Sequence, residues 1–335
     1  MRALWIVLLA ATLCACAPTL QQAGRPEAGF SGPRLEARDF VSFDGARLGL
    51  THWDSQPEEP RAVVIGVHGM NDYANAFHLA APFWATHGIA TYAYDQRGFG
   101  RSPERGIWAP DALKIEDLRT LVALVRARHP GAIIAVAGES LGGAVAMEAF
   151  ASDRPPAADR LILLAPAVWG WSTQPLPYKT LLWFAAKLAP GKVITPPRWL
   201  TAKVTPTDNR QELVAMSRDP LMVWGARSDA LYGLVASMER AWALAGRIRT
   251  PTLYLYGAND EIIPKTPAFE AAHRLPPGDR TAYYAKGWHL LLRDRQARSV
   301  WRDVAAFVLD PSAPLPSGAP AIPAPRGVVA VRGPA

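Results

Sequence analysis

The sequence predicts an α/β fold with a mostly parallel central sheet, helices on both faces and an inserted helical cap. Short apolar segments that end at glycine or polar residues alternate with segments of helical periodicity. Such continuous apolar segments are typical of strands buried on both faces of a parallel sheet. One interval, 169–246, lacks them and is rich in tryptophan, proline and helical pattern. We therefore expect a core formed by 38–168 and 247–310, with 169–246 as the cap.

Composition supports a globular chain with a large core. The chain has 335 residues, of which 50% are hydrophobic, and a net charge of +7 without a run of five basic residues. This pattern disfavours nucleic acid as the main ligand. A weak positive field could favour anionic surfaces, or the arginines could simply be solvated. Both cysteines, Cys14 and Cys16, lie near the start, so no disulfide is expected to stabilise the fold.

The first residues have the layout of a targeting signal. Arg2 precedes an apolar run, 3–13, that is too short to span a bilayer, and small residues follow. The stretch "LCAC" resembles a bacterial lipoprotein signal, which implies a signal peptide over 1–15 and lipidation of Cys16. Because Ala17 follows, the resemblance implies a lipid anchor in the cell envelope, at the outer membrane facing the periplasm. Simple secretion to the periplasm is the alternative.

Two segments at the ends of the chain are expected to be mobile. Residues 16–37 have little periodicity and are interpreted as a tether. Residues 311–335 form a Pro/Ala/Gly-rich tract that is predicted to be a disordered tail.

The elements of the core follow from local patterns. The segments 40–43 and 47–53 flank Asp44-Gly45, which is a two-residue hairpin signal. Buried strands are predicted at 62–69, 89–95, 132–138, 160–166, 252–257 and 280–285. Helices are predicted within 75–88, 111–130, 142–152 and 294–310, and cap helices within 178–190 and 231–246. A ligand site is then expected at the carboxyl ends of the strands.

Ser140 is the candidate nucleophile. It lies in "AGESLGG", directly after an apolar strand and directly before a helical pattern. A strand, a sharp turn and a helix hold such a serine in strained backbone angles, and glycine neighbours leave room for the turn. The alternative is a polar residue in a glycine-rich turn, and the context favours the nucleophile.

A serine hydroxyl needs a base and a group that orients the base. His289 is the candidate base, because it follows the strand 280–285 in a loop at the carboxyl edge. Asp260 is the candidate acid in the loop after 252–257, and Glu261 is its rival. The other histidines are expected to be structural or solvated.

The stretch "GVHGMND" supplies a second turn at this edge. The backbone N–H of Met70 and the N–H of Leu141 are the candidate donors to an oxyanion. His68 could be mistaken for a catalytic residue, but a side chain that braces the turn is the favoured interpretation.

The loop 94–103, "YDQRGFGRSP", carries charged residues after another strand. Asp95 and Arg97 could contact a substrate, but an ion pair that braces the loop is favoured. The loop lacks the lysine and serine of a phosphate-binding loop.

Together, the motifs "HGMND", "DQRGFGRS", "GESLGG", "YGANDEIIP" and "GWHLLLRD" resemble the α/β-hydrolase superfamily, in particular its monoacylglycerol lipase and lysophospholipase branch in the serine aminopeptidase S33 group. The likeness covers roughly 39–310. It implies catalytic roles for Ser140, Asp260 and His289, and hydrolysis of a carboxylic ester with no metal or organic cofactor.

Two departures limit this resemblance. "MNDY" follows "HG" where lipases of the group often have a glutamate-histidine pair, so substrate preference cannot be transferred. The loop "DQRGFGRS" is also close to that of proline iminopeptidases, but those enzymes usually have tryptophan at the position of Leu141.

Three functions remain open. An esterase acting on monoacylglycerols, lysophospholipids or similar amphiphiles needs an apolar tunnel. The cap offers Trp171, Trp183, Phe184, Trp199, Trp224 and Trp242 for it. A serine aminopeptidase needs carboxylates for the substrate ammonium, and the cap has only Glu212 and Glu239 as glutamates. A non-catalytic binding lipoprotein would have no reason to retain a complete triad.

Dehalogenases and epoxide hydrolases are excluded, because they have aspartate in place of Ser140. No protein partner is identified.

Overall fold

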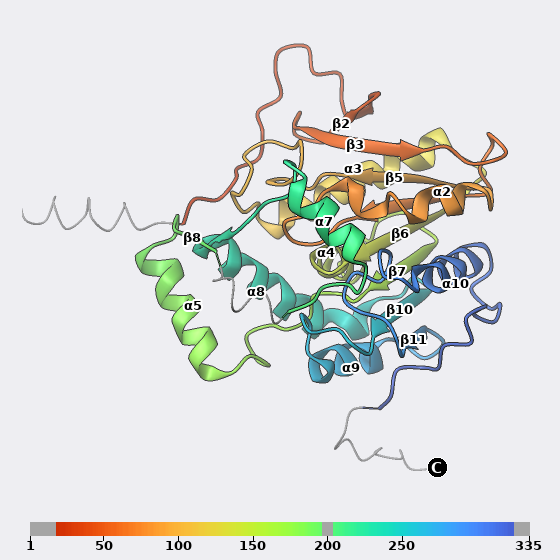
Figure 1. Ribbon diagram of the computed structural model, residues 1–335. Helices are drawn as coiled ribbons and strands as arrows, with labels where there is room; N and C mark the ends of the chain where they lie inside the picture. Colours follow the sequence, from red (N-terminus) through yellow and green to blue (C-terminus); the bar gives the residue numbers. More distant parts are fainter. Residues whose placement is uncertain (1–17, 196–203, 325–335) are drawn as a thin grey trace, which may run out of the picture.

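The computed structural model describes residues 18–195 and 204–324, and it confirms the predicted α/β class. A nine-stranded sheet has the order β1-β2-β3-β5-β4-β6-β7-β10-β11 (Figure 1). The strands are β1 (Arg34–Leu35), β2 (Asp39–Val41), β3 (Arg47–Trp53), β4 (Ala62–Val67), β5 (Ile89–Tyr94), β6 (Ile133–Glu139), β7 (Arg160–Leu164), β10 (Thr252–Gly257) and β11 (Arg280–Tyr284).

The sheet is antiparallel at one end and parallel over the rest. The strands β2 and β3 pair across the expected hairpin, and β3 pairs antiparallel with β5. From β5 to β11 every neighbouring pair is parallel. The residues of β4, β5 and β10 are all buried, as the continuous apolar segments predicted. The carboxyl ends of these strands therefore lie at one edge, where loops can bring distant residues together.

Helices cover both faces of the sheet. Besides the short 3₁₀ turns η1 (Ala74–Phe77) and η2 (Ala245–Arg247), the core helices are α2 (Ala80–Ala85), α3 (Asp111–Arg128), α4 (Leu141–Phe150), α9 (Lys265–Arg274) and α10 (Ala297–Leu309). One apolar cluster joins the sheet to α3, α4 and α9, and a second joins the opposite face to η1, α2 and α10.

The cap interval differs from the sequence-based expectation in two ways. It contains α5 (Leu176–Leu188), α7 (Arg210–Arg218) and α8 (Ser228–Leu244), but also the strands β8 (Val193–Ile194) and β9 (Ala226–Arg227), which pair antiparallel. The expectation of no strand in this interval was therefore wrong. In addition, α8 packs its Val235, Met238 and Ala241 into the main core cluster beside α4. This helix is part of the layer over the sheet, although its sequence was assigned to the cap.

The predicted tether, over its described residues, lies against the core. Leu20 forms a β-bridge with Trp108, and Gln21 is buried, with its side-chain amide donating to the carbonyls of Pro103, Glu104 and Ile107. Further along, β1 pairs with β2. This segment lacks a periodic apolar pattern. It is held to the core instead by hydrogen bonds of the Gln21 side chain and of the backbone. The signal peptide and Cys16 lie outside the described residues.

The predicted disordered tail also has a defined course over residues 311–324. Leu315 and Ile322 are buried, and the N–H of Tyr283 in β11 donates to Pro320 O at 2.8 Å. The prediction of disorder was wrong here, because a Pro-rich extended segment can still pair its carbonyls with an exposed strand edge. Residues 325–335 lie outside the described part of the chain.

Among residues 18–195 and 204–324, no helix combines the length and the apolar character needed to cross a membrane.

Candidate active site

Ser140 occupies the turn between β6 and α4. Its backbone has φ 52° and ψ −116°, a region that residues other than glycine rarely adopt. The turn fits only because its neighbours are small: a Cβ on Gly142 would lie 2.0 Å from Val67 O. The predicted strand, sharp turn and helix are therefore present, and the backbone angles of Ser140 are strained as the motif requires.

Backbone hydrogen bonds hold this strained turn. The N–H of Ser140 donates to Leu164 O at 3.0 Å, and Ser140 O accepts from the N–H of Ala167 at 2.9 Å. Both partners come from the end of β7 or the residues after it. The neighbouring strand thus fixes the direction of the Ser140 side chain.

His289 and Asp260 lie in contact. His289 Nδ1 is 2.9 Å from Asp260 Oδ2, and both side chains are buried. The other carboxylate oxygen of Asp260 accepts from the N–H groups of Ile262 and Ile263 at 2.8 and 2.9 Å. With Nδ1–H donated to Asp260, the second ring nitrogen of His289 is the one that can accept a proton.

The rival carboxylate points elsewhere. Glu261 Oε2 accepts from the N–H of Thr205 at 2.7 Å, and Glu261 is exposed. The pair at this site is therefore formed by Asp260.

The environment of His289 sets the direction of its pKa. Burial acts to lower the pKa, but the charge and the hydrogen bond of Asp260 oppose burial, and the charge of Glu139 adds to them. The result is a pKa above the usual value for histidine. A histidine that binds a proton readily suits a general base.

The turn that carries Met70 lies directly against Ser140. A Cβ on Gly69 would lie 3.8 Å from Ser140 Oγ. Within the described residues, neither the Met70 N–H nor the Leu141 N–H donates a hydrogen bond to another protein group. Leu141 is the first residue of α4, where the helix dipole also favours negative charge. Two donors are thus free next to the serine.

His68 braces this turn, as its favoured interpretation predicted. Its Nδ1 donates to Gly69 O at 2.7 Å, and its Nε2 accepts from the N–H of Gln96 at 2.9 Å. Burial lowers the pKa of His68 and, together with the accepting role of Nε2, favours the neutral ring.

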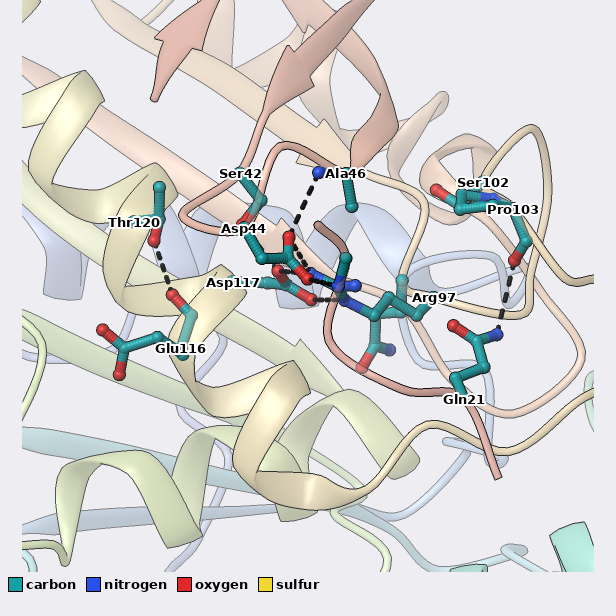
Figure 2. A network of polar contacts seen from close by, with 12 residues as sticks. Gln21, Ser42, Asp44, Ala46, Arg97, Ser102, Pro103, Glu116, Asp117 and Thr120 are labelled. Atoms are coloured by element: carbon teal, nitrogen blue, oxygen red, sulfur yellow. Dashed lines mark hydrogen bonds and ion pairs between the residues drawn. The ribbon is translucent and has the colours of Figure 1, made fainter. Parts of the chain in front are cut away.

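The charges in the loop 94–103 do not pair as the sequence suggested. Asp95 accepts from Arg101 and from the N–H of Ala74. Arg97 donates instead to Asp44 at 2.8 Å and to Asp117 at 2.7 Å, and Figure 2 shows this network. Asp95 and Arg97 therefore do not pair with each other. Each forms ion pairs with other residues and braces the scaffold.

The sequence analysis missed a buried ion network beside the site. Arg293 Nη2 donates to Asp72 Oδ2 at 2.5 Å and to Glu139 Oε2 at 3.0 Å, and all three side chains are buried. Asp72 follows Met70 by two positions, Glu139 precedes Ser140, and Arg293 follows His289 by four. One guanidinium therefore joins all three loops. Their places inside the quoted motifs were the only signal in the sequence.

A cavity of about 620 Å³ lies between the cap and the Met70 turn. It is lined mostly by apolar side chains, among them Leu213, Met222 and Trp224, and it reaches Asn71. The cap is tied to the same turn, since the N–H of Val223 donates to Asn71 O at 3.0 Å. An apolar chain could therefore lie against the cap and reach Asn71, the residue that follows Met70 in the turn.

Comparison with known proteins places this chain in a family. The family described as serine aminopeptidase, S33, matches residues 58–296. The chain belongs to the serine aminopeptidase S33 family.

This S33 chain is similar to a monoacylglycerol lipase of Mycolicibacterium smegmatis, with 28% identity over 81% of the chain and 95% of that protein. It also resembles the crystal structure of a Paleococcus ferrophilus monoacylglycerol lipase, with a TM-score of 0.62, 21% identity, and coverage of 78% of the chain and 98% of that protein. For a soluble variant of the Saccharomyces cerevisiae monoglyceride lipase, the TM-score is 0.68 at 18% identity, and coverage is 86% and 98%. These structures show the α/β-hydrolase fold.

The cap aromatics of the S33 chain do not form one tunnel. Trp224 lines the 620 Å³ cavity, whereas Trp171, Trp183 and Phe184 line a separate hollow of about 360 Å³ at α5. Trp242 packs against Arg274 instead, whose Cζ lies 3.4 Å from the centroid of the tryptophan ring. Trp199 is outside the described residues.

Within the described residues, no group of three or more His, Cys, Asp or Glu side chains is arranged to hold a metal ion.

Proposed function

We propose that this protein is a serine hydrolase that cleaves carboxylic esters, most suitably those of monoacylglycerols, lysophospholipids or similar acyl amphiphiles, through an acyl-enzyme on Ser140. One observation carries the proposal: a buried Asp260–His289 pair with a 2.9 Å hydrogen bond lies at the sheet edge that bears the strained Ser140 turn. The names of the relatives, monoacylglycerol lipase and monoglyceride lipase, support the substrate class.

In the proposed reaction, His289 Nε2 removes the proton from Ser140 Oγ as Oγ bonds to the ester carbonyl carbon. The carbonyl oxygen becomes an oxyanion and accepts hydrogen bonds from the N–H groups of Met70 and Leu141. Asp260 keeps the imidazole in the required tautomer and stabilises its positive charge. The imidazolium then protonates the leaving alcohol, and the carbon–oxygen bond breaks.

Water completes the cycle by the same route. His289 removes a proton from water as the water oxygen attacks the acyl carbon. The second oxyanion then collapses, the bond from the acyl carbon to Ser140 Oγ breaks, and the His289 imidazolium returns the proton to Oγ, which releases a carboxylic acid. The reaction draws only on side chains and backbone N–H groups of this chain.

The cap favours an acyl ester over a peptide. The apolar cavity beside Asn71 suits an acyl chain. Both cap glutamates already have protein partners: Glu239 accepts from the N–H of Ser172 at 2.8 Å, and Glu212 lies 3.5 Å from His78 Nε2. Both are therefore engaged with protein groups, which disfavours the aminopeptidase alternative.

The test is a panel of p-nitrophenyl esters of increasing chain length beside a proline p-nitroanilide. We expect turnover of the esters and none of the anilide; the reverse result would overturn the proposal. A fluorophosphonate probe should label the wild-type chain and leave Ser140→Ala unlabelled. Equal labelling of both would exclude Ser140 as the nucleophile.

We also propose that the enzyme is held in the bacterial envelope by a lipid on Cys16, at the outer membrane facing the periplasm. The support is the sequence pattern of the first seventeen residues. Cells fed a tagged palmitate should label the wild-type chain but not Cys16→Ser. Equal labelling would contradict the anchor and favour simple secretion.

A further inference from the structure

The helix α5 presents an unusually apolar surface. Six of the eleven large apolar side chains that are exposed in the described residues lie on this one helix: Leu176, Tyr178, Leu181, Trp183, Phe184 and Leu188. Leu181 and Leu188 are 71% and 72% exposed. Contiguous apolar surface of this kind marks an interaction site.

The inner side of α5 is apolar as well. Leu182 packs against the main core cluster, and Ala186 is 2% exposed. A surface helix normally places polar residues on its outer side, so a helix that is apolar on both sides needs an apolar neighbour on each. The core supplies one of these neighbours.

The charges carried by α5 and the residues that follow it are of one sign. Residues 176–195 contain three lysines, Lys179, Lys187 and Lys192, and no aspartate or glutamate. Lysines beside exposed tryptophan, phenylalanine and leucine are typical of helices that lie in the interface of an anionic bilayer. A protein partner would not require this combination.

The start of the described chain lies beside the same helix. Pro18 and Leu20 share a cavity of about 270 Å³ with Ala186 and Lys187 of α5. The N–H of Thr19 donates to Asp229 at 3.3 Å, and Leu20 is bridged to Trp108. In Figure 1 the described N-terminal segment begins beside β8, near one end of α5. The residues that follow the proposed lipid anchor are thus fixed next to the apolar helix.

We propose that α5 docks the cap onto an anionic phospholipid surface, with residues 18–21 holding the chain so that α5 and the N-terminal anchor meet the same bilayer. The inference rests on the proposed envelope location and not on the chemistry of Ser140. Docking would also bring the acyl cavity close to the lipid, since Ile194, six residues beyond α5, lines that cavity.

The test measures co-sedimentation with vesicles, using the full chain with Cys16→Ser so that no lipid is attached. In this background, Leu181→Glu with Leu188→Glu should lower the vesicle partition coefficient by about tenfold or more. Leu181→Glu is also made alone, and its matched control is Val214→Glu, which places the same charge on an exposed apolar position of α7. The control should stay within about twofold of its parent.

Lipid composition tests the choice of surface. Partition should be stronger into vesicles of phosphatidylglycerol and phosphatidylethanolamine than into phosphatidylcholine alone. Equal partition into both would contradict an anionic surface. Partition of the double variant equal to that of its parent would overturn the proposal. Conversion of a dimer to a monomer by the double variant, without a change in partition, would assign the helix to a second copy of the chain.

A short soluble ester separates this inference from the proposed function. Unchanged turnover of that ester by the double variant would show that the fold is intact. If no form of the chain cleaves esters, circular dichroism replaces turnover as the check of the fold, and the vesicle measurement still decides the docking proposal.

Discussion

Two buried arginines with the same local chemistry serve different parts of the molecule. Arg97 donates to Asp44 and Asp117, and Arg293 donates to Asp72 and Glu139; both arginines are 2% exposed. In each network, burial opposes the charge of the guanidinium and the two carboxylates restore it, so that the arginine pKa is raised.

The difference lies in what the carboxylates are attached to. Asp44 is in the hairpin turn between β2 and β3, and Asp117 is in α3, so Arg97 joins elements of the scaffold (Figure 2). Asp72 and Glu139 adjoin the Met70 turn and the Ser140 turn, and Arg293 itself lies four residues after His289. The same kind of ion network therefore joins scaffold elements in one place and adjoins the proposed reacting groups in the other.

The largest effect on rate is expected at Asp260, because its carboxylate contacts the His289 imidazole directly. Asp260→Asn should reduce kcat for ester hydrolysis by about 10⁴-fold, because the amide favours the wrong tautomer of His289. Steady-state kinetics with a short p-nitrophenyl ester measure the loss. A variant that retains a tenth of the wild-type kcat would contradict the role of Asp260.

The two arginines should separate rate from stability. Arg293→Met and Arg97→Met should each lower the free energy of unfolding by about 3–5 kcal/mol, because each leaves two buried carboxylates without their cation. Only Arg293→Met should also reduce kcat, on the order of 10²-fold, because three active-site loops lose their common partner. Urea unfolding and kinetics at a temperature where both variants are folded give the two quantities. Equal kcat losses in both variants would remove the distinction.

Glu139→Gln tests the coupling through pH. The charge of Glu139 helps to raise the pKa of His289, whereas that of Arg293 lowers it. Without the carboxylate, the His289 pKa should fall. As the proposed base, His289 is active only when neutral and loses activity as pH falls through its pKa, so the acid limb of kcat/KM should move to lower pH. Asp117→Asn, in the other network, is the control and should leave that limb in place. A shift in the opposite direction would contradict the assignment.

The smallest effect is expected at the edge of the Arg97 network. Ser42 Oγ donates to Asp117 Oδ1 at 2.6 Å, and Ser42→Ala should lower the free energy of unfolding by about 1 kcal/mol while kcat is unchanged. Urea unfolding resolves a change of this size. A measurable loss of kcat would show that the scaffold network also reaches the site.

Local sequence patterns predicted those parts of the molecule whose structure is set by residues adjacent in the sequence. The strained turn at Ser140 follows from a strand, glycines and a helix that are adjacent in sequence. The carboxyl-edge positions of Asp260 and His289 follow from the strands before them. The Arg293 network could not be predicted in this way, because the contact with Asp72 joins residues 221 positions apart. Ion pairs of this kind depend on the packed fold, and periodicity does not report them.

Composition was least informative at the ends of the chain and in the cap. Residues 18–37 and 311–324 bury few apolar side chains, yet hydrogen bonds from Gln21 and to Pro320 hold them in place. The assignment of α8 to the cap failed because a helix over the sheet and a helix of a lid have the same amphipathic pattern.

The contact between Pro320 and Tyr283 has a consequence for how copies of the molecule behave together. The strand β11 ends the sheet order, and its outer backbone groups would otherwise be open to pairing with a strand of another molecule. Residues 311–324 supply a carbonyl acceptor at this edge, but their prolines lack the N–H groups that would extend the ladder of strand hydrogen bonds. The sheet therefore ends here. We therefore expect residues 311–324 to limit edge-to-edge pairing of β11 between molecules in a concentrated solution.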